Sequence, residues 1–381
     1  MYDPERQSYF RMAAPESFQP HWWNRAEPVW TRALRRNRTV AMFWWDGCQV
    51  DINGTRPQSC IPYGGYSTKI DYQMDQKILE TVEGFKRDSL DLAMLYYEGP
   101  DAEGTQSLLS AMARPALKGT LGGHRDGPQS YGIQTTVGKV DHYLRLLQKS
   151  LEQEGLLNQV NIVVVSDHGM TRTSPDSTRH IDMDSLVNDQ DVHVMLDKGP
   201  FAMLFPKPGR EQEVLKSLFF HKTQGLRVFT KETIPEEWHF KNSDRVAPIV
   251  LVADEGYYIM PFSNPTKTLP GNNGPSPGVH GYDPRMSDMW GIFYARGPGK
   301  YSLCEDEASQ YAIRPGVKGT TVMRMVDVYN VMCYALGMEP GPNSGSWDHV
   351  RGFLEPNYDH YLFSHLQRAK RAAPRSEENR A

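Results

Sequence analysis

Short apolar runs alternate with longer stretches of helical periodicity along most of this chain. The runs are rich in β-branched and aromatic residues and predict strands at 40–45, 92–97, 161–165, 201–205, 249–253 and 290–295. The periodic stretches predict helices at 71–86, 131–151, 211–219 and 326–336. This alternation favours an α/β fold, with a mixed, mainly parallel sheet covered by helices on both faces.

Two of the predicted helices carry a clear apolar stripe that we expect to face the core. The stripes consist of Ile78, Leu79, Val82 and Phe85 in the first, and Val137, Val140, Leu144 and Leu147 in the second.

Composition narrows the class of protein. The 381 residues suit one large or two ordinary domains, and a net charge of −4 argues against a nucleic-acid-binding surface. The locally basic stretch 32–38 is best interpreted as a solvated helix face. No apolar stretch approaches the roughly 20 residues that span a bilayer, and the polar residues 1–20 are no signal peptide.

Four cysteines are too few for a disulfide framework in a chain of this size. Cys48 and Cys60 are near enough to pair across a loop, while Cys333 lies in a helical pattern and is expected in the core. Asn37 and Asn53 each begin a glycosylation sequon, although a chain of this length contains one or two by chance.

The most informative short segment is Asp167-His168-Gly169, directly after the apolar run 162–165 and Ser166. Open α/β sheets bind ligands at the carboxyl ends of their strands, and a carboxylate beside an imidazole suits zinc. Gly169 would let the backbone turn sharply there. Alone, such a pair is more often an ordinary polar strand end.

Two further segments strengthen the metal interpretation. Asp101 also follows an apolar run, and His280 stands in Val279-His280-Gly281-Tyr282-Asp283. Together, the three segments offer enough oxygen and nitrogen ligands for one complete zinc site and part of a second.

The order of Pro-Asp, Ser-Asp-His-Gly-Met and His-Gly-Tyr-Asp resembles the ectonucleotide pyrophosphatase/phosphodiesterase family of the alkaline phosphatase superfamily. Further landmarks at 1–4, 27–30, 43–44, 244–248, 251–256, 295–298 and 328–333 extend the resemblance over nearly the whole chain, closest to short members with a catalytic domain alone. The resemblance implies an alkaline-phosphatase-like fold, two zinc ions and a threonine nucleophile. It also implies a small phosphodiester or nucleotide substrate, release of nucleoside 5′-monophosphates, and an extracellular location, secreted or membrane-anchored.

Carried over by this resemblance, Asp167 and His168 would bind the zinc ion beside the nucleophile. Asp101, His280 and one further histidine would bind the other. The family's Asp-x-x-Gly-His pattern is interrupted here, because the next suitable histidine after Gly104 is His124. Removing residues 105–123 on paper restores the pattern, so we expect these residues to be an exposed or disordered insert, either a retained intron or a lineage-specific loop. The alternative is that His124 is an ordinary loop histidine.

A second departure concerns the nucleophile. The family's Asp-Gly ligand and Thr-Phe-Pro segment precede its Met-Tyr-Asp landmark, which here is residues 1–3, and Thr-Phe-Pro occurs nowhere in the chain. We therefore expect residues 1–365 to be an incomplete catalytic domain without the first strand and nucleophile helix, followed by a disordered tail at 366–381. The catalytic threonine is unknown, and the 381 residues are expected to be nearly inactive as a truncated gene model, an internal start or a pseudoenzyme.

Trp30 and Trp44 lie where the family binds its nucleotide, and a base would stack well on either face. Core packing is the alternative for both, and Trp45-Asp46-Gly47 replaces the family's Trp-Pro-Gly.

Other activities remain open. Sulfatases are a poor match because the segment from Cys60 to Gly64 lacks their arginine. A choline-phosphodiester or lysophospholipid phosphodiesterase fits the same superfamily. A catalytically dead zinc-binding ectodomain that recognises nucleotides or proteins is the alternative of a different class.

Overall fold

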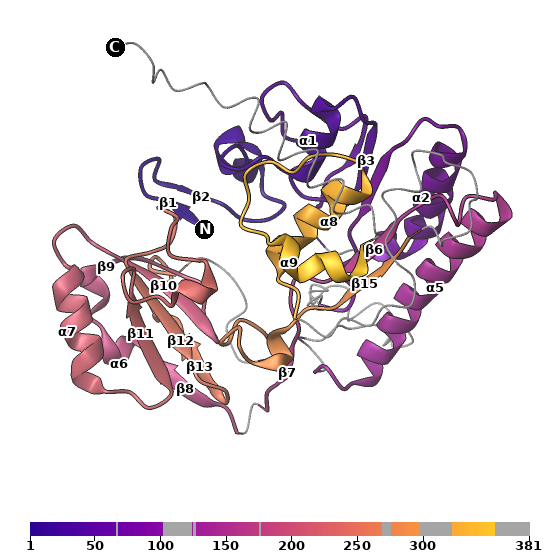
Figure 1. Ribbon diagram of the computed structural model, residues 1–381. Coiled ribbons are helices and arrows are strands. Elements are labelled where there is room, and N and C mark those ends of the chain that lie inside the picture. The colour runs from indigo at the N-terminus through magenta and orange to yellow at the C-terminus, as the bar shows by residue number, and fades with distance from the viewer. Residues whose placement is uncertain are drawn as a thin grey trace, which may run out of the picture.

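The computed structural model describes residues 1–65, 68–101, 124, 127–174, 177–268, 276–297 and 322–354. Within these ranges the elements form two lobes (Figure 1). We call them the helix-rich lobe, which holds α1, α2, α5, α8 and α9, and the sheet lobe, which holds β9 to β12. The expected insert at 105–123 and the expected tail at 366–381 lie outside the described residues.

The helix-rich lobe is built on a parallel sheet in the order β4 (Ser59–Ile61), β3 (Val40–Phe43), β5 (Leu92–Leu95). A separate antiparallel pair joins β6 (Ile162–Val165) to β15 (Phe293–Arg296). The helices are α1 (Val29–Arg35), α2 (Thr68–Lys86), α5 (Tyr131–Gln153), α8 (Val328–Ala335) and α9 (Trp347–Val350).

Alternate residues of β3 enter two different cores. Val40 and Met42 pack with α1 and α8, whereas Ala41 and Phe43 pack with α2 and α5. Helices therefore cover both faces of this sheet, as the apolar pattern predicted.

The sheet lobe contains an antiparallel sheet in the order β11 (Leu226–Thr230), β12 (Ile249–Ala253), β10 (Phe201–Pro206), β9 (Val192–Leu196). Its helices are α6 (Met183–Leu186) and α7 (Glu211–His221). Alongside it, β8 (Arg179–Asp182) runs parallel to β13 (Tyr257–Met260). The short hairpin β1 (Tyr2–Asp3) and β2 (Ser8–Tyr9) packs on this lobe, where Tyr2 contacts Phe205 with ring centroids 5.0 Å apart.

One small pair lies between the lobes, where β7 (Thr171–Arg172) is antiparallel to β14 (Gly278–Val279) (Figure 1). Seven 3₁₀ turns complete the described elements: Pro15–Phe18, Pro20–Trp22, Asp189–Asp191, Glu236–Trp238, Ser287–Met289, Met325–Asp327 and Arg351–Phe353.

The α/β fold with mixed sheets is confirmed, but fewer of its described strands pair in parallel than the sequence predicted. Parallel pairing links β3 to β4 and β5, and β8 to β13, while the four-stranded sheet is antiparallel throughout. Apolar runs predict where strands occur but do not specify their direction.

Two helix stripes also differ from prediction. Ile78 and Val82 are buried, but Leu79 is 49% exposed and Val137 is 51% exposed. The buried face of α5 instead contains Thr136, whose hydroxyl donates to the carbonyl of Gly132 at 3.0 Å. A polar residue satisfied in this way on an inner face is invisible to hydrophobic periodicity. Cys48 and Cys60 do form a disulfide, and Cys333 is a buried free thiol, as expected.

Candidate metal centre

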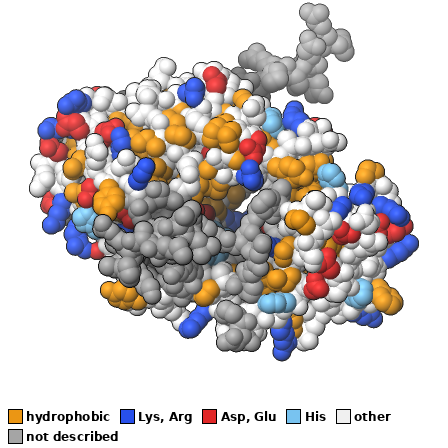
Figure 2. All heavy atoms as spheres, turned by 180° about the vertical axis from the view of Figure 1, so that it is seen from behind, with side chains coloured by type: hydrophobic (Ala, Val, Ile, Leu, Met, Phe, Trp, Pro, Cys, Tyr) orange, Lys and Arg blue, Asp and Glu red, His pale blue; other side chains and the backbone are white. Residues whose placement is uncertain are grey.

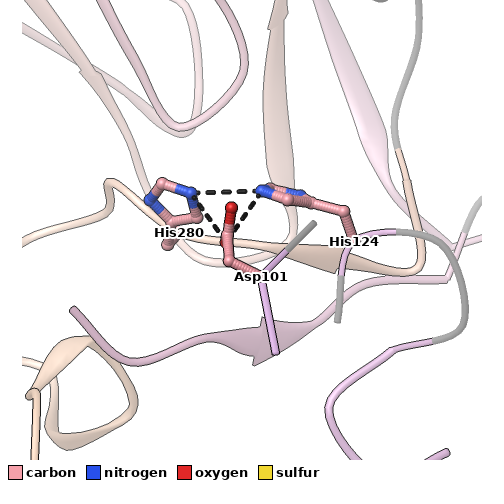
Figure 3. Close-up of side chains that lie close together, drawn as sticks. All are labelled: Asp101, His124 and His280. Atoms are coloured by element: carbon pink, nitrogen blue, oxygen red, sulfur yellow. Dashed lines mark hydrogen bonds and ion pairs between the residues drawn. The ribbon is translucent and has the colours of Figure 1, made fainter. Parts of the chain in front are cut away.

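Three chain segments deliver metal-competent side chains to one place. Asp101 follows β5 through a turn in which its N–H donates to Glu98 at 2.9 Å. His280 follows β14 directly, and His124 lies beside it. The three side chains point toward one another (Figure 3), and one ligand atom from each lies within 4.8 Å of the others.

The Oδ1 atom of Asp101 is the centre of this group. It lies 3.3 Å from Nε2 of His124, 3.5 Å from Nε2 of His280 and 3.9 Å from Nε2 of His168. These approaches are not aligned as hydrogen bonds, and among the described residues this buried atom has no hydrogen-bond partner. A buried carboxylate oxygen surrounded by imidazole nitrogens fits a bound cation, because such an oxygen is otherwise costly to leave unsatisfied.

Backbone carbonyls orient two of the imidazoles. Nδ1 of His124 donates to the carbonyl of Gly278 at 2.7 Å, and Nδ1 of His168 donates to that of Gly169 at 2.8 Å. When Nδ1 carries the proton of a neutral ring, Nε2 keeps its lone pair for a metal ion. The Nε2 atoms of His124 and His280 lie 3.1 Å apart, at hydrogen-bond distance, so both face the same point beside Asp101.

The protonation states suit metal binding. Burial alone would raise the pKa of the Asp101 carboxyl, but the surrounding imidazoles outweigh it and hold this pKa below its ordinary value. Burial, reinforced by His168, lowers the pKa of His280 from 6.5 to about 4. At neutral pH, Asp101 is therefore an anion and His280 a neutral imidazole, the forms that bind a metal ion.

Asp167 and His168 lie beside this group. The ring of His168 stacks on that of His280 with centroids 3.5 Å apart, and its Nε2 lies 3.6 Å from Oδ2 of Asp167. The side chain of Asp167 is 69% exposed. All five residues that the sequence singled out as metal ligands therefore lie in one neighbourhood, with Asp167 at its solvent edge.

Glycines fix the backbone that presents Asp167 and His168. A Cβ on Gly169 would lie 2.1 Å from the carbonyl oxygen of Asp288, and one on Gly291 would lie 2.7 Å from that of Ser166. Residues 166–169, after β6, therefore pack closely against residues 288–292, before β15. We call this contact the interlock, and a side chain at either glycine would force the two segments apart. The sequence predicted a sharp turn at Gly169, but the φ of this residue is not positive; glycine is required there because the two segments pack closely.

Sequence reasoning missed Tyr96, at the end of β5. Burial raises its pKa, as do the carboxylates of Glu98, Asp167 and Asp101, so the phenol lies near the candidate ligands. Its ring centroid is 5.5 Å from that of Tyr63, whose hydroxyl donates to Glu98. Tyr96 was counted only as part of an apolar run, and strand periodicity alone gives no signal for this placement.

The two tryptophans singled out as substrate-binding are buried. Trp30 is 8% exposed and packs with α8, and Trp44 is 5% exposed and packs with Phe43 and Ile70. Their burial is what core packing requires. Trp44 also adopts a φ of 56°, a conformation that large side chains rarely adopt.

The sequon residues Asn37 and Asn53 are both exposed, with φ values of 58° and 52°. In the part of the chain that the structure describes, no helix is long and apolar enough to cross a membrane. On the face in Figure 2, basic and acidic side chains of the described residues are interspersed.

Comparisons with known proteins identify the family of this chain. The model of the family "Type I phosphodiesterase / nucleotide pyrophosphatase" matches residues 1–283. Human ectonucleotide pyrophosphatase/phosphodiesterase family member 5 is 29% identical over 93% of this chain and 64% of its own length. Human bis(5′-adenosyl)-triphosphatase is also 29% identical, over 93% of this chain and 67% of its own length.

Solved structures give the same result. Murine family member 5 superimposes with a TM-score of 0.74 and 31% identity, covering 93% of this chain and 82% of that one. An inactive variant of it in complex with AMP matches with the same TM-score and 30% identity, over the same shares of the two chains. The present chain spans about two thirds of the length of the curated relatives, and 64% of human family member 5. It belongs to the type I phosphodiesterase / nucleotide pyrophosphatase family and has that family's alkaline-phosphatase-like α/β fold.

Proposed function

We propose that the protein is a zinc-dependent phosphodiesterase that hydrolyses nucleotide phosphodiester or pyrophosphate bonds and releases nucleoside 5′-monophosphates. The observation that carries the proposal is the buried Oδ1 of Asp101, which lies among three imidazole nitrogens and has no hydrogen-bond partner in the described part of the chain. Zinc favours such mixed nitrogen and oxygen ligands. Family membership supports the reaction class proposed for this site.

Asp101, His124 and His280 are the proposed ligands of one zinc ion. Asp167 and His168 supply part of a second site, since they offer only two side chains and Asp167 is largely exposed. When bound, two zinc ions would neutralise phosphate oxygens and lower the pKa of the attacking group. The chain's own contribution is to hold His280 neutral and Asp101 ionised, and to keep the Nδ1 protons of His124 and His168 on backbone carbonyls.

The nucleophile limits what these residues do alone. The 381 residues contain no Thr-Phe-Pro segment, and without an activated nucleophile the covalent step of such a mechanism is lost. We therefore expect metal binding with very little hydrolysis. The substrate is a small nucleotide or phosphodiester, and the proposed location is extracellular, with Asn37 and Asn53 as glycosylation sites. Trp30 and Trp44 would then support the nucleotide site from within the core.

Metal binding and activity can be tested separately. The 381-residue protein should bind zinc, measured by competition with a chromophoric chelator, and His280→Ala should weaken binding at least about 100-fold, more than loss of an outer partner costs. His142→Ala is the matched control, because His142 pairs with Asp75 on the surface of α5 and its side chain is 57% exposed. Equal zinc affinity of His280→Ala and the unaltered protein would refute the metal assignment.

The proposed activity can be tested with an added segment. Placing a family segment with Asp-Gly and Thr-Phe-Pro ahead of residue 1 should produce chelator-sensitive cleavage of a nitrophenyl nucleotide ester, and His280→Ala should abolish it. Cleavage of choline phosphodiesters instead of nucleotide esters would overturn the substrate class. Full nucleotide hydrolysis by the 381 residues alone, unaffected by His280→Ala, would overturn the mechanism.

A further inference from the structure

The backbone around His280 is held from both sides. On one side, β14 pairs with β7, which follows His168 closely in the sequence. On the other side, the chain turns at Gly281, with a φ of 103°, and the next two residues are buried, Tyr282 at 4% and Asp283 at 6% exposure. His280 thus lies between the β14–β7 pairing on one side and the buried residues Tyr282 and Asp283 of the sheet lobe on the other.

The second attachment is an ion-pair network. Asp283 accepts from Nη1 of Arg227, on β11, at 2.7 Å, and from Nη2 and Nε of Arg285 at 2.6 and 3.0 Å. Nε of Arg227 also lies 3.1 Å from Asp254, at ion-pair distance although not aligned as a hydrogen bond. Arg227 therefore joins Asp283 to the chain at the end of β12. The hydroxyl of Tyr282 adds a hydrogen bond to the carbonyl of Tyr257 at 2.9 Å.

We propose that Asp283 is a positioning residue for the metal centre: through its ion pair with Arg227, it holds the loop that places His280 against Asp101 and His124. This inference rests on the proposed metal-binding function. Neither the carboxylate of Asp283 nor the guanidinium of Arg227 belongs to the ligand group, and both act through the backbone between residues 280 and 283.

The physical argument is that metal binding tolerates only small errors in the positions of its ligands. A metal ion needs its ligands within about 0.2 Å of their required distances, whereas a loop without anchors samples displacements larger than that. The side chain of Asp283 is only 9% exposed and takes hydrogen bonds from two arginines and from the N–H of Arg285. Arg227 is 30% exposed, and charge-assisted hydrogen bonds to a buried carboxylate hold a loop more firmly than ion pairs between two exposed side chains.

The test is zinc affinity of the 381-residue protein. Asp283→Asn should lower affinity by roughly 10- to 100-fold, the range found when partners outside the ligand set are lost. It should also alter the visible absorption spectrum of the cobalt(II)-substituted protein, because the arrangement of ligands changes. In Asp283→Asn, Arg227 keeps Asp254 as a partner, so no buried charge is left isolated. The zinc affinity of Arg227→Lys should lie between those of the unaltered protein and of Asp283→Asn, since a single ammonium cannot contact both carboxylates in the same way.

Asp191→Asn is the matched control. Asp191 pairs with Arg210 at 3.0 Å in the same lobe, and its side chain is 19% exposed, but it belongs to the 3₁₀ turn 189–191 and not to the 280–285 loop. Its zinc affinity and cobalt spectrum should match those of the unaltered protein.

The outcomes separate the two hypotheses. If His280→Ala weakens binding while Asp283→Asn and Arg227→Lys both keep the affinity and cobalt spectrum of the unaltered protein, the positioning role is overturned and the metal site stands. If the unaltered protein does not bind zinc, both proposals are wrong. If Asp283→Asn fails to fold, Arg227→Lys decides: lowered affinity with a normal melting temperature supports the role, and unchanged affinity refutes it.

Discussion

Substituting alanine for Gly169 should destabilise the protein and weaken metal binding together. The added Cβ would lie 2.1 Å from the carbonyl oxygen of Asp288 and 2.6 Å from that of Trp290. Both contacts are with backbone atoms, so no flexible side chain can move aside. The segment after β6 would have to separate from the segment before β15.

The size of the effect follows from the contacts at that interlock. Three hydrogen bonds donated by backbone N–H groups hold the two segments: Gly169 N–H to Met289 at 3.0 Å, Ser166 N–H to Ile292 at 3.1 Å, and Ile292 N–H to the Ser166 hydroxyl at 2.9 Å. Each contributes about 1 kcal/mol net, and forcing an extra methyl group into a packed site costs about 1–3 kcal/mol. With some relaxation, we expect a loss of about 3–5 kcal/mol, a large fraction of a typical unfolding free energy.

Urea denaturation followed by tryptophan fluorescence would measure this loss. Gly138→Ala is the control, because Gly138 lies inside α5 with nothing within 4 Å of an added Cβ, and alanine there should stabilise by about 0.5–1 kcal/mol. A loss below about 1 kcal/mol for Gly169→Ala, less than the smallest overpacking cost, would show that the interlock is not rigid and refute the reasoning.

Three further outcomes follow from the described contacts. Replacing Cys48 and Cys60 by alanine should lower the unfolding free energy by about 3 kcal/mol, as for a loop of similar length; equal stability of the oxidised and reduced protein would contradict this. Hydrogen bonds from Arg285, and then from Arg227, hold the pKa of Asp283 below its ordinary 3.8, so its contribution to stability is present above that pH and is lost as pH falls further. Asp283→Asn should therefore flatten the stability profile in acid, measured by thermal melts. Expression through a secretory pathway should add glycans at Asn37 and Asn53, and glycosidase treatment without a change in gel mobility would exclude them.

The positions of several strands and of the candidate ligands beside them could be predicted from sequence because both depend on local order. The run at 249–253 became β12 to the residue, and the apolar runs before Asp101 and Asp167 became β5 and β6. A polar pair at the carboxyl end of a strand can be located as soon as the strand itself is predicted. His124 required the family pattern as well, and the structure brings it to Asp101.

Pairing between distant elements could not be predicted in this way. β15 runs antiparallel to β6, although both read as similar apolar runs, and the inner face of α5 includes Thr136 and Ser150 rather than Val137. The direction of a strand and the rotation of a helix about its axis depend on the neighbouring element that each packs against. A hydrophobic pattern does not identify that neighbour.

His280 and Arg227 show why candidate metal ligands are easier to recognise from sequence than the residues that anchor their loops. His280 is recognisable because only a few residue types bind zinc and because it stands in a short motif with Gly281 and Asp283. Arg227 lies 56 positions from Asp283 and looks like any surface arginine on a strand. Its importance arises only when β11 is placed beside the 280–285 loop, where its guanidinium meets two carboxylates at once. Ligand chemistry limits the residue types at a site, whereas many arrangements of charge could anchor the same loop. The anchor is therefore found by its contacts in the folded chain and not by its sequence.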